Sequence, residues 1–279
     1  SITNIGYNAF RNCNNLIYNT YNNANYLGNE KSKYLVLMNI IDKEISEFTF
    51  ESSTRLIYNN AFSNCTNLSA INIPYRVVFV GPYAFSDCTN LKEARLSDQM
   101  SEITDSMFIR CSNLDYIEIG VNTKIIGYSS FADCSNLNVI SIPIGVKQIK
   151  DNAFSNCSNL RSVILSEGIV SIGNSAFNNC KKLVSINFPK SIINIGAYAF
   201  SRCSSLKNVH LPNSINKIEN YTFYGCNSLE TIRLQEGLIT IGDFAFGNCE
   251  NLKNVILPES IMDMSKPADL KLEEVSCLK

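Results

Sequence analysis

Apolar residues recur along the chain at one fixed spacing that is far longer than the period of a helix or a strand. Phenylalanine returns every 23 residues, at Phe62, Phe85, Phe108, Phe131, Phe154, Phe177, Phe200, Phe223 and Phe246. Relative to each Phe, cysteine follows after three residues, leucine after six, and Ile or Val precedes by five. A strict period of this length indicates an array of identical units, in which each unit buries its apolar face against its neighbours.

The second half of each unit predicts a β-strand. In Leu137-x-x-Ile140-x-Ile142-Pro143, apolar residues alternate with the polar Ser141, and proline ends the strand. The Ala that usually precedes the Phe, with Asn, Ser and Thr nearby, suits a tight turn or a 3₁₀ segment at the opposite corner. At six positions glycine follows the Ile or Val that lies five residues before the Phe, and we expect a bend with positive φ there: Gly6, Gly81, Gly127, Gly173, Gly196 and Gly242.

These features together predict a repeat solenoid. We expect a right-handed superhelix of about eleven coils, with a parallel β-sheet on the concave face and short turns or 3₁₀ segments at the corners. We also expect a single domain over residues 1–279.

The array is irregular near its start. Phe10 and Phe62 are 52 residues apart, which is two periods plus six residues. The turn-like residues 28–32 precede an apolar run at 34–38, so we expect an inserted hairpin within about residues 17–50 that replaces one Ala-Phe corner. The functional alternative is a binding insertion. The first residues begin in the middle of a repeat, which suggests that the chain is a fragment of a longer array.

The array also diverges at its end. The Phe column is occupied by Asp269 and the Cys column by Leu272, while Leu272-x-x-Val275-x-Cys277 still has the strand pattern. We therefore expect a divergent C-terminal coil over residues 259–279, as is usual for a solenoid cap.

The repeat consensus resembles a known family. The pattern A-F-x-x-C-[ST]-[NS]-L-x-x-[IV]-x-[IL]-P, as in the stretch Ala153–Leu160, resembles the BspA-type (Treponema pallidum type) leucine-rich repeat over nearly the whole chain. The irregular segment from Tyr26 to Leu37 is similar to a variant coil of that family. The resemblance implies a non-enzymatic cell-surface or secreted protein of bacteria or mucosal protists that adheres to host matrix or to other cells. It implies no particular ligand, and the family has no shared binding residues that map onto numbered positions.

The charge and hydropathy of the sequence argue against a nucleic-acid-binding protein and against a membrane-spanning protein. The chain has 24 basic and 25 acidic residues, a net charge of −1, and no basic stripe of the kind that nucleic-acid-binding proteins present. No apolar run approaches the length of a membrane span, so we expect no membrane insertion. The chain contains no signal peptide, so a surface or secreted location is an expectation from the resemblance alone.

Eleven cysteines are the richest source of candidate chemistry. Before the C-terminal tail no two of them lie closer than 23 residues, which is unlike the close Cys and His pairs of metal sites. Each repeat cysteine lies midway between an apolar Phe and an apolar Leu, so a buried ladder of free thiols is the favoured interpretation. Disulfides between adjacent coils and metal binding are the alternatives. We expect no cofactor and no metal.

No residue pattern indicates catalysis. His210, the only histidine, lies at an outward strand position, and no Ser or Cys nucleophile is expected to face it. The acidic pair Glu273 and Glu274 lies in a polar tail and is expected to be solvated. The N-x-[ST] sequons at Asn64, Asn67, Asn156 and Asn220 follow from the repeat consensus itself.

The outward strand positions vary from coil to coil, whereas the inward positions hardly vary. Extended sheet faces are the usual binding surfaces of solenoids, and Tyr and Arg are frequent interface hot spots. The candidate partner-binding face is therefore Arg95, Tyr116, Glu118, Asn187, His210 and Arg233. The partner expected there is a protein or glycan, such as host extracellular matrix. The alternatives are an ordinary solvated sheet face, and a structural spacer region of a larger surface protein with no ligand of its own.

Overall fold

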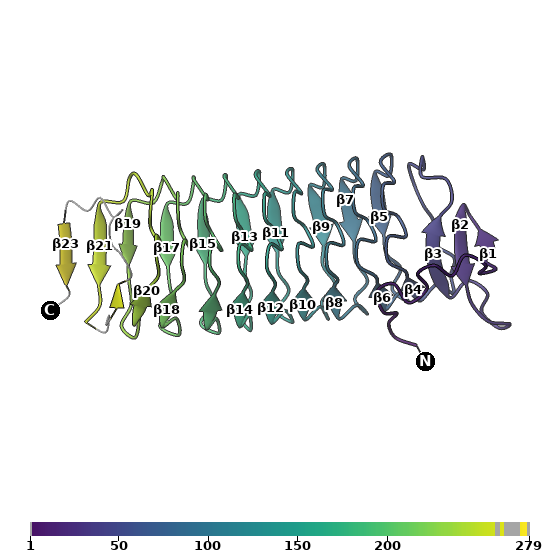
Figure 1. The fold of residues 1–279 in the computed structure, drawn as a ribbon, viewed down its shortest axis with the longest axis horizontal. Helices are drawn as coiled ribbons and strands as arrows, with labels where there is room; N and C mark the ends of the chain where they lie inside the picture. The colour runs from purple at the N-terminus through teal and green to yellow at the C-terminus, as the bar shows by residue number, and fades with distance from the viewer. Residues whose placement is uncertain (1, 260–262, 265–273, 278–279) are drawn as a thin grey trace.

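The chain forms a single rod of stacked coils (Figure 1). The computed structural model describes residues 2–259, 263–264 and 274–277. About ten turns of roughly 23 residues follow one another along the rod, as the period predicts. Strands and turns make up the described residues, among which there is no helix and hence none that spans a membrane.

The predicted strand segments form a parallel ladder along one long edge of the rod (Figure 1). Its members are β5 (Ala70–Asn72), β7 (Glu93–Arg95), β9 (Tyr116–Glu118), β11 (Val139–Ser141), β13 (Ser162–Ile164), β15 (Ser185–Asn187), β17 (Asn208–His210), β19 (Thr231–Arg233), β21 (Asn254–Leu257) and β23 (Glu274–Cys277). Within two hydrogen-bonded groups, β5 to β9 and β11 to β23, residues pair with those one coil later, as Ile140 does with Val163. The middle residue of each of β5 to β19 points inward and is buried, and its two neighbours point outward.

A second parallel ladder runs along the opposite edge, which the sequence pattern did not reveal. It consists of β4 (Leu56–Ile57), β6 (Phe79–Val80), β8 (Glu102–Ile103), β10 (Ile125–Ile126), β12 (Gln148–Ile149), β14 (Ser171–Ile172), β16 (Asn194–Ile195), β18 (Lys217–Ile218), β20 (Thr240–Ile241) and β22 (Asp263–Met264). These strands are hydrogen-bonded in three groups, β4 to β6, β8 to β16 and β18 to β22. Each strand has only two residues, and from β6 to β20 only the second of them is buried, so no alternation is visible in the sequence.

The core between the two ladders is a stack of phenylalanines flanked by thiols. From Phe62 to Phe246 the rings of successive coils lie parallel, with centroids 4.9 to 5.7 Å apart. From Cys88 to Cys249, each Sγ donates to the Phe carbonyl of the preceding coil at 3.1 to 3.3 Å. The ten cysteines from Cys13 to Cys249 are all free, so the thiol ladder is confirmed for the coils from Cys65 to Cys249.

The corner that contains the Phe is a series of hydrogen-bonded turns. The residues two before and two after the Phe adopt positive φ, as in Tyr198 (58°) and Arg202 (59°) around Phe200. The glycine column does not have positive φ, so that expectation was wrong. The glycines there are needed for space, because a Cβ on Gly196 would lie 2.6 Å from the backbone N of Asn174 in the preceding coil.

The irregular segment is a three-stranded meander. β1 (Asn19–Tyr21), β2 (Ala24–Leu27) and β3 (Val36–Ile40) are antiparallel, and β3 joins the second ladder beside β4. The Ile40 backbone N donates to the Ala61 carbonyl, as the Phe62 backbone N does to the Ala84 carbonyl, so Ile40 takes the place of a Phe. The tyrosines of the meander, Tyr26 and Tyr34, pack with ring centroids 5.4 Å apart.

The repeat-like residues before the meander lie outside the stack, near β4 and β6 (Figure 1). Phe10 packs on Tyr58 with ring centroids 5.7 Å apart, and its backbone N donates to the Tyr58 hydroxyl at 3.0 Å. Cys13 is exposed. The prediction that every repeat cysteine points inward is therefore wrong for Cys13. Its coil is not part of the stack, because β3 occupies the site next to the Phe62 coil. Most of the expected divergent coil at 259–279 lies outside the described residues.

Candidate functional site

The six candidate residues all lie on the outward side of the three-residue strands from β5 to β21, which we call the β5–β21 face. Alternation along each strand places them there, because the inward residue between each outward pair anchors the strand in the core. Strand order divides them into two groups. Arg95, Tyr116 and Glu118 lie on β7 and β9, whereas Asn187, His210 and Arg233 lie on β15, β17 and β19. Three strand spacings separate β9 from β15, or roughly 14 Å.

The first group is an exposed ionic cluster whose charged side chains already pair with one another. Arg95 Nε donates to Glu93 Oε1 at 2.9 Å, and an Arg95 guanidinium N lies 3.6 Å from Glu118 Oε2. The Arg95 guanidinium carbon is 5.9 Å from the centroid of the Tyr116 ring. The hydrogen bond to Glu93 raises the pKa of Arg95. Glu93 was not among the predicted candidates, although a residue two before Arg95 on a strand shares its face.

The second group forms a continuous row. Parallel register places Asn187 opposite His210 and His210 opposite Arg233. These three residues, with Ser185, Asn208 and Thr231, line a shallow hollow of about 170 Å³.

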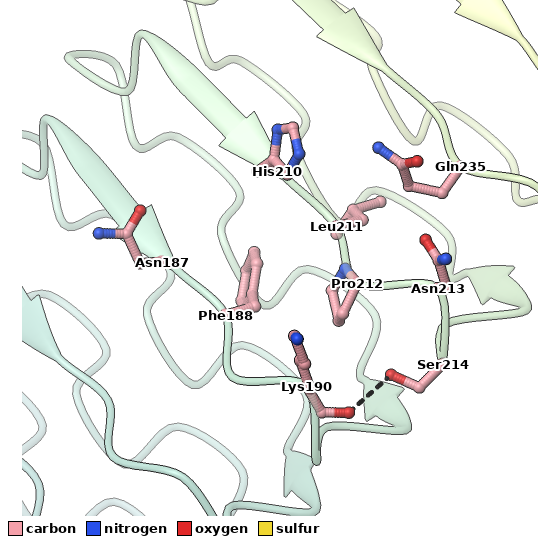
Figure 2. Close-up of a pocket in the computed structure, with 9 residues that line it drawn as sticks. All are labelled: Asn187, Phe188, Lys190, His210, Leu211, Pro212, Asn213, Ser214 and Gln235. Atoms are coloured by element: carbon pink, nitrogen blue, oxygen red, sulfur yellow. Dashed lines mark hydrogen bonds between the residues drawn. The ribbon is translucent and has the colours of Figure 1, made fainter.

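A larger hollow adjoins this row where the strands end (Figure 2). It has a volume of about 610 Å³ and shares Asn187 and His210 with the smaller one. Its other lining residues are Phe188, Lys190, Leu211, Pro212, Asn213, Ser214 and Gln235. Apart from Asn187 and His210, none of these lining residues was predicted from the sequence. The available signal was Phe188, an aromatic ring in a column that otherwise holds mostly Leu or Ile.

The site has the groups for binding and few for covalent chemistry. Burial raises the pKa of the ladder thiols from Cys65 to Cys226, to about 12 for Cys88 and Cys203, so these thiols are poor nucleophiles at neutral pH. A hydrogen bond with the Cys226 side chain lowers the pKa of Cys249 instead. No group of three or more His, Cys, Asp or Glu able to hold a metal is found within the described residues. The outward residues offer amides, one imidazole, guanidinium groups and aromatic rings.

Solved structures similar to this chain include bacterial leucine-rich repeat proteins. A leucine-rich repeat protein from Bacteroides ovatus is 26% identical over 93% of this chain and 76% of its own, with a TM-score of 0.63. The pneumococcal vaccine antigen PcpA is 19% identical over 82% of this chain and 61% of its own, with a TM-score of 0.51, a likeness that supports the fold alone. A leucine rich cell surface protein from Faecalibacterium prausnitzii is 20% identical over 88% of this chain and 90% of its own, with a TM-score of 0.48. Among curated proteins, none matches.

The repeat itself identifies the family. The family model described as BspA type leucine rich repeat region matches residues 41–161 and 147–268, in six copies. Those ranges cover the regular coils, with their Phe, Cys and Leu columns, and the strands that build the β5–β21 face. The chain belongs to the BspA-type leucine-rich repeat family.

Proposed function

We propose that this protein is a non-enzymatic binding module of the cell surface or of the secreted fraction, which adheres to host matrix or to cells through its β5–β21 face. Membership of the BspA-type family supports the surface location and the absence of catalysis. The partner is a protein or a glycan, and no membrane insertion or nucleic acid is involved.

The observation on which the proposal depends is the contrast between the two sides of the same strands. On β9, Ile117 is buried, whereas its neighbours Tyr116 and Glu118 are exposed. The same alternation holds in β17 and β19, while the outward residue types differ from coil to coil. A rigid face whose geometry is fixed by the core, and whose side chains are free to vary, is what an interaction surface requires.

The test is binding to immobilised extracellular-matrix proteins and to epithelial cells by wild type and by variants of this face. Arg95→Ala, Tyr116→Ala and Arg233→Ala are expected to weaken binding by about tenfold or more where a residue is a hot spot. The matched control is Tyr128→Ala with Lys150→Ala, since Lys150 Nζ lies 4.7 Å from the Tyr128 ring centroid and neither residue is on the β5–β21 face.

Binding that survives all three changes shows that the face is wrong. Absence of binding by wild type to every matrix protein and cell type favours the spacer alternative.

A further inference from the structure

The larger hollow beside β15 and β17 is a local departure from the repeat. Most coils have Leu or Ile as the last inward residue of the strand segment, whereas this coil has Phe188. Phe188 meets Phe200 edge-on, with ring centroids 5.5 Å apart, and is only partly buried. Its ring therefore contributes an apolar surface to the hollow, together with Leu211 and Pro212 (Figure 2).

Polar side chains around this apolar surface have unused hydrogen-bonding capacity. Within the described part of the chain, the side-chain amides of Asn187, Asn213 and Gln235 make no hydrogen bond to another protein group. Elsewhere the repeat does pair its amides, as Asn136 does by donating from Nδ2 to Oδ1 of Asn113 at 3.2 Å. An amide donates two hydrogen bonds and accepts others, so these three groups offer several donors and acceptors to a ligand.

The charged side chains that line the two adjoining hollows are basic, and the nearby Glu167 carboxylate, which accepts from the Lys190 backbone N at 3.4 Å, is not among the lining residues. Lys190 lines the larger hollow, Arg233 lines the smaller one, and His210 lines both. No Asp or Glu lines either hollow. The first group differs, since Arg95 is already engaged by Glu93 and Glu118. An anionic ligand is therefore favoured at the second group.

We propose that the two adjoining hollows from Asn187 to Gln235, which we call the 187–235 groove, bind an anionic oligosaccharide. The assignment rests on the proposed function, because it names the ligand class for one part of the same face. A sugar ring presents apolar C–H groups on one side and hydroxyls at its edge, which matches an aromatic and proline surface ringed by amides. The volume of about 610 Å³ lies in the range of ordinary ligand pockets. Lys190 and Arg233 then bind the acidic groups of the glycan, which are either uronate carboxylates or sulfate esters.

The test is calorimetric titration of the whole chain with four defined probes. These are a heparin hexasaccharide, with sulfate and carboxylate, a hyaluronan hexasaccharide, with carboxylate only, neutral maltohexaose, and hexaglutamate as an acidic peptide. We expect binding of heparin, or of heparin and hyaluronan, that weakens as ionic strength rises. Binding of both identifies the carboxylate as sufficient, and binding of heparin alone identifies the sulfate. Failure of both to bind overturns the proposal, as does equal binding of hexaglutamate.

Variants place the ligand in the groove. Lys190→Gln keeps the length of the side chain and removes its charge, and Phe188→Leu restores the usual residue of the column, so both are expected to fold. Each is expected to weaken glycan binding about tenfold, while Lys182→Gln, an exposed lysine outside the groove, leaves it unchanged. Undiminished glycan binding by both groove variants overturns the assignment.

The same panel separates this proposal from the proposed function. If no glycan binds but Arg95→Ala and Tyr116→Ala still reduce binding to matrix proteins, the groove assignment fails and the binding function stands. If the glycan binds through the groove but no matrix protein or cell is bound, the wider adhesion function fails.

Discussion

At the level of single residues, the cysteine column shows how one side chain serves the stack. A thiol is small enough to lie between the Phe and Leu of one coil, and its weak donor reaches a carbonyl in the preceding coil. That carbonyl belongs to the Phe three residues before the equivalent cysteine, so each thiol joins two coils at their buried corners. A serine would donate more strongly but at a greater desolvation cost, which is consistent with the unbroken use of cysteine.

Thiol reactivity is expected to divide the cysteines by position. Cys13 is exposed and Cys249 is half-buried, whereas the eight from Cys65 to Cys226 are buried. Titration with a thiol reagent is expected to modify Cys13 quickly, Cys249 slowly and the buried eight only after denaturation, when close to all eleven react. Cys13→Ser removes the fast phase. Recovery of about one thiol after denaturation means five disulfides and contradicts the ladder.

Alkaline pH is expected to destabilise the protein through the same thiols. Burial raises the folded-state pKa of the eight buried thiols from Cys65 to Cys226, to about 12 in Cys88, while an unfolded thiol ionises at about 8.5. Their contribution to stability is thus complete below about pH 8.5. It decreases by about 1.4 kcal/mol per pH unit for each thiol until the folded pKa is reached. Melting temperatures at increasing pH measure this slope. Cys134→Ala is expected to have a shallower slope, and an identical slope contradicts the mechanism.

The glycine column tests whether glycine is required there because a Cβ has no room or because the backbone needs a positive φ. In Gly196→Ala the new Cβ meets the backbone of Asn174, so we expect a loss of about 1–3 kcal/mol of unfolding free energy. Gly6 occupies the same column, and nothing lies within 4 Å of its Cβ position. Gly6→Ala is therefore the matched control, with an expected change within about 0.5 kcal/mol. Equal losses from the two changes, measured by denaturant unfolding, contradict the steric explanation.

At the level of elements, the meander β1–β3 replaces one regular corner, and its tight turn is hydrogen-bonded to the residues that follow β3. Asn22 and Asn23 both have positive φ, as a two-residue hairpin turn requires. Asn23 Nδ2 donates to the Asp42 carbonyl at 2.8 Å, and Asn23 Oδ1 accepts from the Asp42 backbone N at 2.9 Å. The side chain of one turn residue therefore holds the hairpin against the end of β3.

Two substitutions separate the functions of Asn23. Asn23→Gly keeps access to positive φ and loses both side-chain hydrogen bonds, for an expected cost of about 1–2 kcal/mol. Asn23→Ala also incurs the left-handed backbone strain, for an additional cost of about 1 kcal/mol. Hydrogen exchange of the β3 amides, Val36–Ile40, reports the local loss. Equal protection in wild type and Asn23→Gly shows that the side chain does not fasten the hairpin.

Regular elements could be predicted from the sequence, because every coil repeats the same evidence. The inward places of Ile140 and Ile142 followed from alternation, and both residues are buried. Three features could not be predicted. A two-residue strand such as Gln148–Ile149 has no period, positive φ at Tyr198 contradicts the preference of an aromatic residue, and the groove depends on how Phe188 packs. The six candidate residues were placed on one face by the period, but their division into two groups depends on side-chain contacts.

At the level of the whole molecule, the proposed binding of a partner that contacts both groups of the β5–β21 face depends on the distance between them. Each coil contacts its neighbours through the same columns. The regular stacking therefore fixes the distance between the ionic cluster at β7 and β9 and the 187–235 groove. A partner that contacts both groups must match this spacing, whereas a ligand confined to the groove is indifferent to it.

Removal of one complete coil tests whether the columns hold the coils in register and whether the partner contacts both groups. Deleting residues 144–166 takes out 23 residues and joins Pro143 to Glu167, so that every column continues and Phe131 stacks on Phe177. We expect a folded rod that is shorter by about 5 Å, measured by small-angle scattering, with one cooperative melting transition.

Deleting residues 145–166 instead leaves one extra residue at the junction. That control is expected to melt in two transitions, because the halves no longer share a register, and a single undiminished transition contradicts the column model. Glycan binding by the groove is expected to survive the 23-residue deletion. Loss of matrix or cell binding in the same folded variant then shows that the partner spans both groups.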